Sequence, residues 1–208
     1  MASIEECKDF VINKCGIEQY KLDPKGDYDF NLSGYRVGKY NGPPGYLKKY
    51  IPPIGWIAIG LKVLGCYDGG NNDWIGTENK HGEWYMGYHG VKNTSSIYRI
   101  CHEGFRKGPS QQEKHSKNTN PLTKILHPAC EEGAYFAQNI NDAVSYASNI
   151  YYKGNNYKIV FMCRINPYSV RICDKGYERD YMITDGNYNT KNEARPYRIL
   201  VKKETCYI

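Results

Sequence analysis

Tyrosine is the feature of this sequence that most constrains its fold. The chain has 208 residues, of which 21 are Tyr, whereas Leu, Ile, Val and Phe together number only 40, or 19%. So few large apolar residues would indicate disorder if the net charge were high and aromatics were scarce. Here the net charge is +6 and 14% of the residues are aromatic. Because a Tyr ring buries a large apolar area while its hydroxyl finds a partner or water, the sequence predicts a folded chain with a tyrosine-rich core.

The length suggests one main domain with an appendage, at roughly 150 residues per domain. Ser3-Ile4-Glu5-Glu6 is a capping-box pattern that predicts a helix over 4–14, which Gly16 would close. The following stretch, up to Pro52-Pro53, is rich in Gly and Pro and indicates extended structure and turns. We therefore expect an N-terminal extension over 1–50 and a main domain over 51–208.

Alternating and β-branched segments predict the elements of that domain. Strands are expected at 54–64 (where a helix is the alternative), 83–89, 133–137 (where a turn is the alternative), 157–165, 168–173 and 193–203. Helices are expected from Ser95-Ser96 to His102 before Gly104 and from Asn139 or Asn141 to about 150, and a mobile loop is expected over 107–121. This order, strands and helices first and then mainly strands, predicts an α+β fold on a mixed or antiparallel sheet and argues against a βαβ repeat.

Charge and cysteine usage narrow the class of partner. The mild positive charge suits a phosphate-bearing ligand, and nucleic acid is not favoured because Lys48-Lys49 and Lys202-Lys203 are the longest basic blocks. No apolar run approaches the ~20 residues of a membrane span, and the N-terminus lacks a signal-peptide core. We expect a cytoplasmic or nuclear protein with free thiols and no metal, since His127-x-x-Cys130 is an isolated half-site.

Three segments carry the residues of a reaction centre. The first is Tyr88-His89-Gly90, followed by a helix and Glu103-Gly104-Phe105-Arg106. In the second, Glu132-Gly133-Ala134-Tyr135-Phe136-Ala137 precedes Ala143-Val144-Ser145-Tyr146-Ala147, so that Tyr135 and Tyr146 stand eleven residues apart. The third runs from Asn192-Glu193 to Ile199-Leu200. In order and spacing they resemble the His, Tyr and Glu motifs of the PARP-like (diphtheria-toxin-like) ADP-ribosyltransferase superfamily. They are most similar to the transferase-like domain of neuralized-like and related fungal proteins.

The resemblance implies an ADP-ribosyltransferase-like fold, a split mixed or antiparallel β-sheet with short flanking helices. It also implies that the chain takes NAD as co-substrate and transfers ADP-ribose to an acceptor protein or to itself, with a nucleic-acid acceptor less favoured. Transfer of a single unit is favoured over poly-transfer. The residues that it implies are, for catalysis, Glu193, His89 and Tyr135, and, for NAD binding, His89, Gly90, Tyr135, Tyr146 and Ser145.

The chemistry asks for the same residue types. Cleaving the nicotinamide–ribose bond develops positive charge on the ribose, which a carboxylate such as Glu193 would stabilise. Tyr135 and Tyr146 would stack on the nicotinamide, and His89 would bond the adenosine ribose. Gly90 would leave its backbone open to the carboxamide. Where the family has a carboxamide-binding Ser, this chain has Ala143, and Ser145 is the nearest substitute.

Three other functions fit the same residues. With water as acceptor the chain would be an NAD glycohydrolase, and without turnover it would be a module that binds NAD, ADP-ribose or a protein. Exposed Tyr between basic residues would suit a domain that binds nucleic acid by stacking on its bases. The carboxylate of Glu193 favours an enzyme over a module that only binds. The acceptor would contact loops within 107–131 or 174–192.

Overall fold

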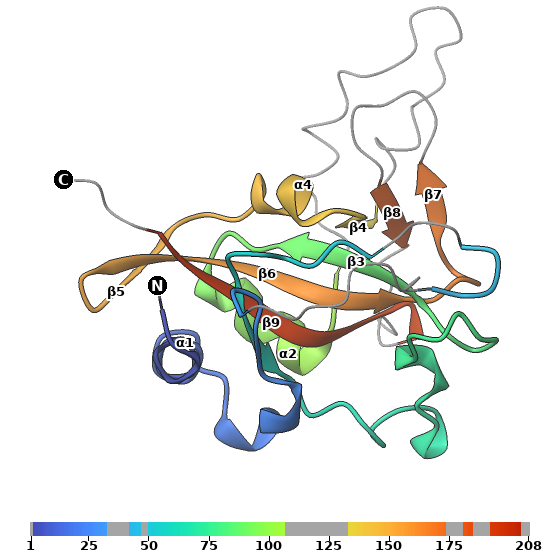
Figure 1. The fold of residues 1–208 in the computed structure, drawn as a ribbon, viewed down its shortest axis with the longest axis horizontal. Coiled ribbons are helices and arrows are strands. Elements are labelled where there is room, and N and C mark those ends of the chain that lie inside the picture. Colours follow the sequence, from blue (N-terminus) through green and yellow to red (C-terminus); the bar gives the residue numbers. More distant parts are fainter. Residues whose placement is uncertain are drawn as a thin grey trace, which may run out of the picture.

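The computed structural model describes residues 2–32, 42–46, 50–106, 133–173, 181–184 and 192–204. These residues form an α+β fold around one antiparallel sheet, as expected (Figure 1). The strands are β1 (Tyr28–Asp29), β2 (Ile57–Gly60), β3 (Tyr85–Gly90), β4 (Ala134–Ala137), β5 (Ile150–Tyr152), β6 (Asn155–Ile165), β7 (Arg171–Cys173), β8 (Tyr181–Thr184) and β9 (Ala194–Glu204), and the α-helices are α1 (Ile4–Asn13), α2 (Thr94–Glu103) and α4 (Ile140–Val144). In the described part of the chain, no helix is long and apolar enough to cross a membrane.

The two long strands β6 and β9 form the centre of the sheet. The strand order is β1-β2-β9-β6-β3-β4-β8-β7, with β5 paired to the beginning of β6. β3 and β4 share one registered pair, Tyr88 with Ala137, whereas every other pair of neighbouring strands shares two or more. The group β4-β8-β7 is therefore joined to the rest of the sheet through a narrow junction.

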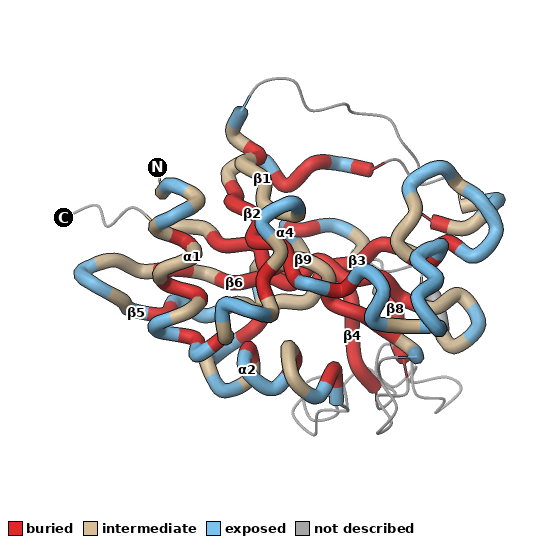
Figure 2. Tube along the Cα trace, turned by 90° about the horizontal axis from the view of Figure 1, so that it is seen from below, coloured by how far each residue is buried: buried red, intermediate tan, exposed pale blue. Residues whose placement is uncertain are grey.

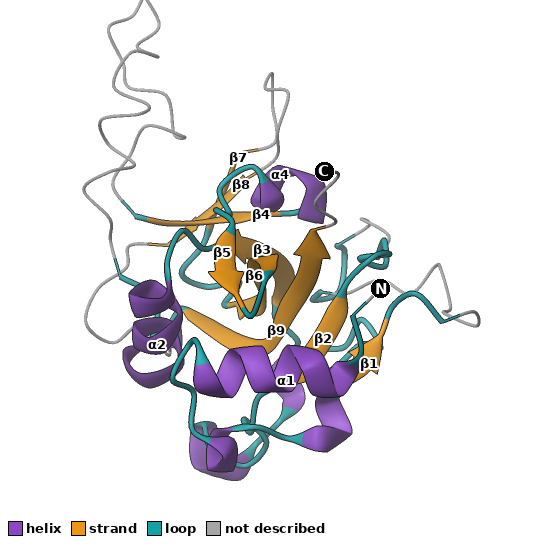
Figure 3. Ribbon diagram, turned by 90° about the vertical axis from the view of Figure 1, so that its left-hand side faces the viewer, coloured by secondary structure: helices purple, strands orange, loops and turns teal. Residues whose placement is uncertain are grey.

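The sheet has two buried faces with different residues. On the helix face, Ile59, Phe161 and Ile199 pack against α1 and α2. On the tyrosine face, Tyr88, Tyr135, Met162 and Leu200 pack against α4 and against the segments around Phe30 and Trp56. Figure 3 shows α1 and α2 on one side of the sheet and α4 on the other, and Figure 2 shows that burial is greatest along the central strands. The two faces carry different residues because successive side chains of a strand point to opposite sides of the sheet.

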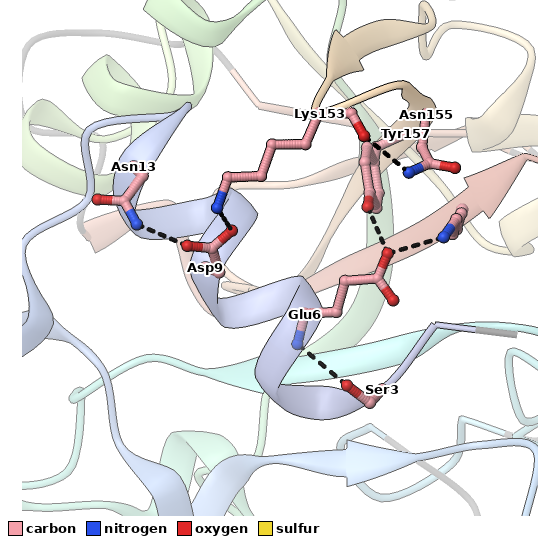
Figure 4. A network of polar contacts seen from close by, with 8 residues as sticks. Ser3, Glu6, Asp9, Asn13, Lys153, Asn155 and Tyr157 are labelled. Carbon is pink, nitrogen blue, oxygen red and sulfur yellow. Dashed lines mark hydrogen bonds and ion pairs between the residues drawn. The ribbon is translucent and has the colours of Figure 1, made fainter.

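The N-terminal helix belongs to the main core. The Ser3 hydroxyl accepts the Glu6 amide, as the capping box predicts, and the Glu6 carboxylate accepts hydrogen bonds from Tyr157 and Lys203. Asp9 pairs with Lys153 on the β5–β6 hairpin (Figure 4). Phe10, fully buried, stacks on the Tyr157 ring at 4.4 Å. Residues on both sides of position 50 thus share one core and one sheet, since β1 also pairs with β2.

Two helices differ from the expectation. The N-cap of α2 is Asn93, whose side chain accepts the Ser96 amide, although Gly104 ends the helix as predicted. The predicted helix to about residue 150 is wrong, because α4, capped by Asn139, ends at Val144. The next residue is Ser145, whose hydroxyl donates a hydrogen bond to the Asp142 carbonyl. Such a local side-chain bond competes with continuation of the helix. The chain then enters β5.

Two buried arginines hold the long connection between β2 and β3. The guanidinium of Arg195 lies over the rings of Trp84 and Tyr67, at 4.2 and 4.4 Å, and forms a bidentate pair with Asp68. Arg164 donates to the carbonyls of three residues of the same connection, Trp84, Ile75 and Gly76. Such bonds satisfy buried backbone oxygens, so the connection is fixed to the sheet.

Candidate functional site

Tyr135, Tyr146 and Gly90 meet on the tyrosine face where β3 ends. Tyr135 is in β4 and is buried. Tyr146 follows α4 and packs, partly buried, against the same apolar cluster. After β4 the chain forms α4, which packs on β3, β4 and β6, and Tyr146 then packs against the apolar cluster that contains Tyr135.

Gly90 allows α4 to pack closely on β3. A Cβ at position 90 would collide with the carbonyl oxygen of Ala143 and would lie 3.1 Å from the Ala147 nitrogen. The backbone of α4 and of the turn after it therefore rests directly on β3. Since backbone cannot move aside as a side chain can, any larger residue would displace α4 and Tyr146 with it. The packing of α4 thus requires a glycine at position 90, which the sequence analysis expected only for contact with a ligand.

His89 lies on the opposite face of the sheet from Tyr135. Its ring contacts Phe105 and Phe136 on the helix face, with centroids 5.0 and 5.7 Å away. Nδ1 nevertheless reaches the carbonyl oxygen of Tyr135 across the gap between β3 and β4, at 2.9 Å. Because a carbonyl only accepts, Nδ1 carries the proton and the neutral ring keeps its lone pair on Nε2.

The other nitrogen of His89 is uncommitted. In the described part of the chain, Nε2 makes no hydrogen bond. Burial under the two phenylalanines lowers the pKa of His89 below its ordinary value of 6.5, and the bond to Tyr135 offsets only part of this effect. The ring is therefore held as an oriented, neutral hydrogen-bond acceptor.

Ser145 does not replace the missing serine. The structure places it on the exposed side of the turn after α4, where its hydroxyl donates to the Asp142 carbonyl at 2.7 Å. Ala143 is the residue buried against the tyrosine face. Neither Ala143 nor Ser145 therefore supplies a side chain that would hydrogen-bond a carboxamide at this site.

Glu193 is not brought to the other predicted site residues. It precedes β9, and its carbonyl accepts the Asn166 amide. Its neighbour Ala194 is registered with Ile165, which faces Tyr85 at the beginning of β3. His89 is four residues further along β3, or about 13 Å. Glu193 therefore lies at the opposite end of the sheet from the site.

A different residue of β9 reaches the level of the site. Ile199 is registered with Phe161 and hence with His89, and Arg198 and Leu200 flank it. From Ala194 to Lys203, β9 has no acidic residue. Sequence reading passed over Arg198, although its alternation with the buried Leu200 places both on the tyrosine face.

No protein-family model and no curated protein matches the chain. Among the residues that the structure describes, no group of three or more His, Cys, Asp or Glu side chains could hold a metal ion. The half-site of His127 and Cys130, the 107–121 loop and the two expected acceptor loops fall wholly or largely outside those residues.

Proposed function

We propose that the chain is an ADP-ribosyltransferase-like domain that binds NAD or ADP-ribose at Tyr135, Tyr146 and His89. The observation that carries the proposal is the convergence of Tyr135 and Tyr146, through α4, at the end of β3. A nicotinamide ring between the two tyrosines would gain about 0.5–2 kcal/mol from each ring contact. The narrow junction between β3 and β4 suits the split sheet that the resemblance implies.

His89 supports the same ligand. Within the described residues its Nε2 makes no hydrogen bond and can accept one, and the ribose hydroxyls of a dinucleotide are donors. Because Nδ1 is bound to the Tyr135 carbonyl, the ring is oriented by the strand that also carries the stacking tyrosine. Because His89 and the two tyrosines lie on opposite faces of the sheet, one ligand would reach both only by passing between β3 and β4, which share a single registered pair.

Binding without turnover fits the geometry better than transfer. Stabilising the ribose cation requires a carboxylate close to the nicotinamide–ribose bond. Glu193, the carboxylate that the sequence resemblance assigns to this task, lies at the other end of the sheet. Transfer of ADP-ribose to an acceptor, and hydrolysis of NAD, are accordingly outcomes that the experiment below separates from binding.

Isothermal titration with NAD tests the site, and mass spectrometry of free nicotinamide tests turnover. Tyr146→Ala removes one stacking ring and should weaken NAD binding about tenfold, the equivalent of 1.4 kcal/mol. Tyr151→Ala, which removes an exposed tyrosine from β5, is the matched control and should bind as the wild type does.

Two results would count against the proposal. Equal NAD affinity in Tyr146→Ala and wild type would reject the aromatic site. Release of nicotinamide by the wild type would instead show a transferase or glycohydrolase. Glu193→Gln would then decide whether that residue acts, since its side chain should matter only if the carboxylate reaches the ribose.

A further inference from the structure

His102 joins α2 to the segment that follows α1 (14–22). Its Nδ1 lies 2.8 Å from the carbonyl oxygen of Tyr98, one turn earlier in α2. Its Nε2 lies 2.9 Å from Oε2 of Glu18 and 3.2 Å from Oε1 of the same carboxylate. The imidazole therefore connects two parts of the chain that are 84 residues apart in sequence.

Both partners of the imidazole are hydrogen-bond acceptors. A backbone carbonyl has no proton to donate, and neither has a carboxylate. The pKa of Glu18 lies below its ordinary value, first because its own backbone amide donates to the carboxyl and then because of His102 and Lys21. A neutral imidazole carries one N–H, whereas the imidazolium carries two. Only the protonated ring of His102 therefore donates to both partners.

The surroundings of the ring also favour a cation. The imidazole stacks on the ring of Tyr98, with the centroids 3.9 Å apart and the planes at 19°, and an aromatic face attracts positive charge. His102 lies in the last turn of α2, where the helix dipole favours basic side chains. A Cβ on Gly16 would lie 3.7 Å from Cδ2 of Tyr98, so the segment after α1 rests against the same ring.

The other titratable groups around His102 keep their charge state near neutral pH. Besides Glu18 and Tyr98, they are Lys21 and Cys15 from the N-terminal side, Tyr67 from the β2–β3 connection, and Arg99, Cys101 and Glu103 from α2. Burial raises the pKa of Cys15 and Cys101 to about 12, so both thiols stay neutral. Glu103 pairs with Arg106. Among these groups, histidine is the one whose charge changes between pH 5 and 8.

We propose that His102 is a pH-sensitive clasp, which in its protonated form anchors the last turn of α2 to the segment after α1 and releases it as the pH rises. The inference does not rest on the proposed function. The anchored turn precedes Phe105, whose ring contacts His89. Because both side chains of the clasp are partly exposed, it contributes less to stability than a buried group, and it offsets only part of the opposite pH dependence of His89.

A double-mutant cycle isolates the clasp. Urea denaturation of wild type, Glu18→Gln, His102→Gln and the double variant measures the coupling between the two side chains, and the titration of His89 cancels because all four proteins contain it. At pH 6.0 the coupling should change the unfolding equilibrium constant about two- to fivefold, and at pH 8.5 it should be absent. The matched control is the pair Glu103 and Arg106 on the same helix, whose coupling should be the same at both pH values.

Equal coupling of Glu18 and His102 at both pH values, or none at pH 6.0, would overturn the inference. Nitrogen-15 nuclear magnetic resonance of the wild-type imidazole keeps the test decisive if a variant does not fold. Both ring nitrogens of His102 should carry a proton at pH 6.0, and one of them should at pH 8.5. A neutral His102 ring at pH 6.0 would reject the clasp.

Discussion

His89 uses its two ring nitrogens differently. Nδ1 is fixed by the Tyr135 carbonyl, and Nε2 is left as an acceptor. Strand alternation alone separates His89 from Tyr88, so the sequence already contained the signal that His89 and the tyrosine face lie on opposite sides. What sequence could not supply is the gap between β3 and β4 through which the ring still reaches Tyr135.

The lowered pKa of His89 predicts how stability depends on pH. In the unfolded chain the imidazole takes up a proton near pH 6.5, whereas in the folded protein it remains neutral to lower pH. The unfolded state therefore binds more protons below this pH, and stability falls as the pH decreases from about 6.5.

Thermal melts of the wild type at pH 7.5 and 5.5 should show this decrease, and His89→Gln should show a smaller one. His81→Gln, at an exposed position, is the control and should behave as the wild type. An identical decrease in His89→Gln and wild type would show that His89 is not held neutral.

At the scale of elements, α1 is as much part of the fold as any strand. Phe10 is fully buried and stacks on Tyr157 of β6, and Val11 lies in the same core. Its hydrogen-bonded contacts with the β5–β6 hairpin add specificity to this packing (Figure 4). An appendage with its own stability would leave the rest of the chain unaffected when it is perturbed.

Phe10→Ala tests this integration. Removing a buried aromatic ring should lower the free energy of unfolding by about 3–5 kcal/mol, in one cooperative transition measured by circular dichroism during urea denaturation. Tyr20→Ala, which removes an exposed ring, should change it little. A two-step transition in Phe10→Ala, with the second step at the wild-type midpoint, would show that residues 1–50 fold separately.

The elements differ in how far sequence could predict them. The capping box at Ser3 and the stop at Gly104 located α1 and α2 to within a residue or two, because both signals are local. The strand β5 pairs with β6 through a two-residue turn in which Lys153 and Gly154 both have positive φ. This is a local hairpin signal that the expected elements left out. β8 was also missed. It pairs with β7, its neighbour in sequence, and with β4, which lies far away in sequence, and only the second pairing has no local signal.

The candidate site shows the same limit. The eleven-residue spacing of Tyr135 and Tyr146 was part of the resemblance, and in the structure both residues pack in or against one apolar cluster. Glu193 was placed by order along the chain, but its position in space depends on the register of β9 against β6, which contains a bulge next to Met162. The same register brings Arg198, and not an acidic residue, to the level of His89.

At the scale of the molecule, the proposed site lies where the sheet is weakest. The strands that carry His89 and Tyr135 share one registered pair, Tyr88 with Ala137, beside the bond from His89 to the Tyr135 carbonyl. In contrast, β6 and β9 are paired along most of their length. A ligand that contacts both sides of this junction would add to the connection between them. Binding of NAD should therefore change the environment mainly of residues around β3, β4 and α4.

Nuclear magnetic resonance of the isotopically labelled protein during titration with NAD tests this claim most directly. The account predicts that the backbone amides of Gly90, Tyr135 and Tyr146 change their chemical shifts with one common dissociation constant, while the amide of Glu193 at the other end of the sheet does not. Shift changes centred on Glu193, or none at these three amides at saturating NAD, would contradict it.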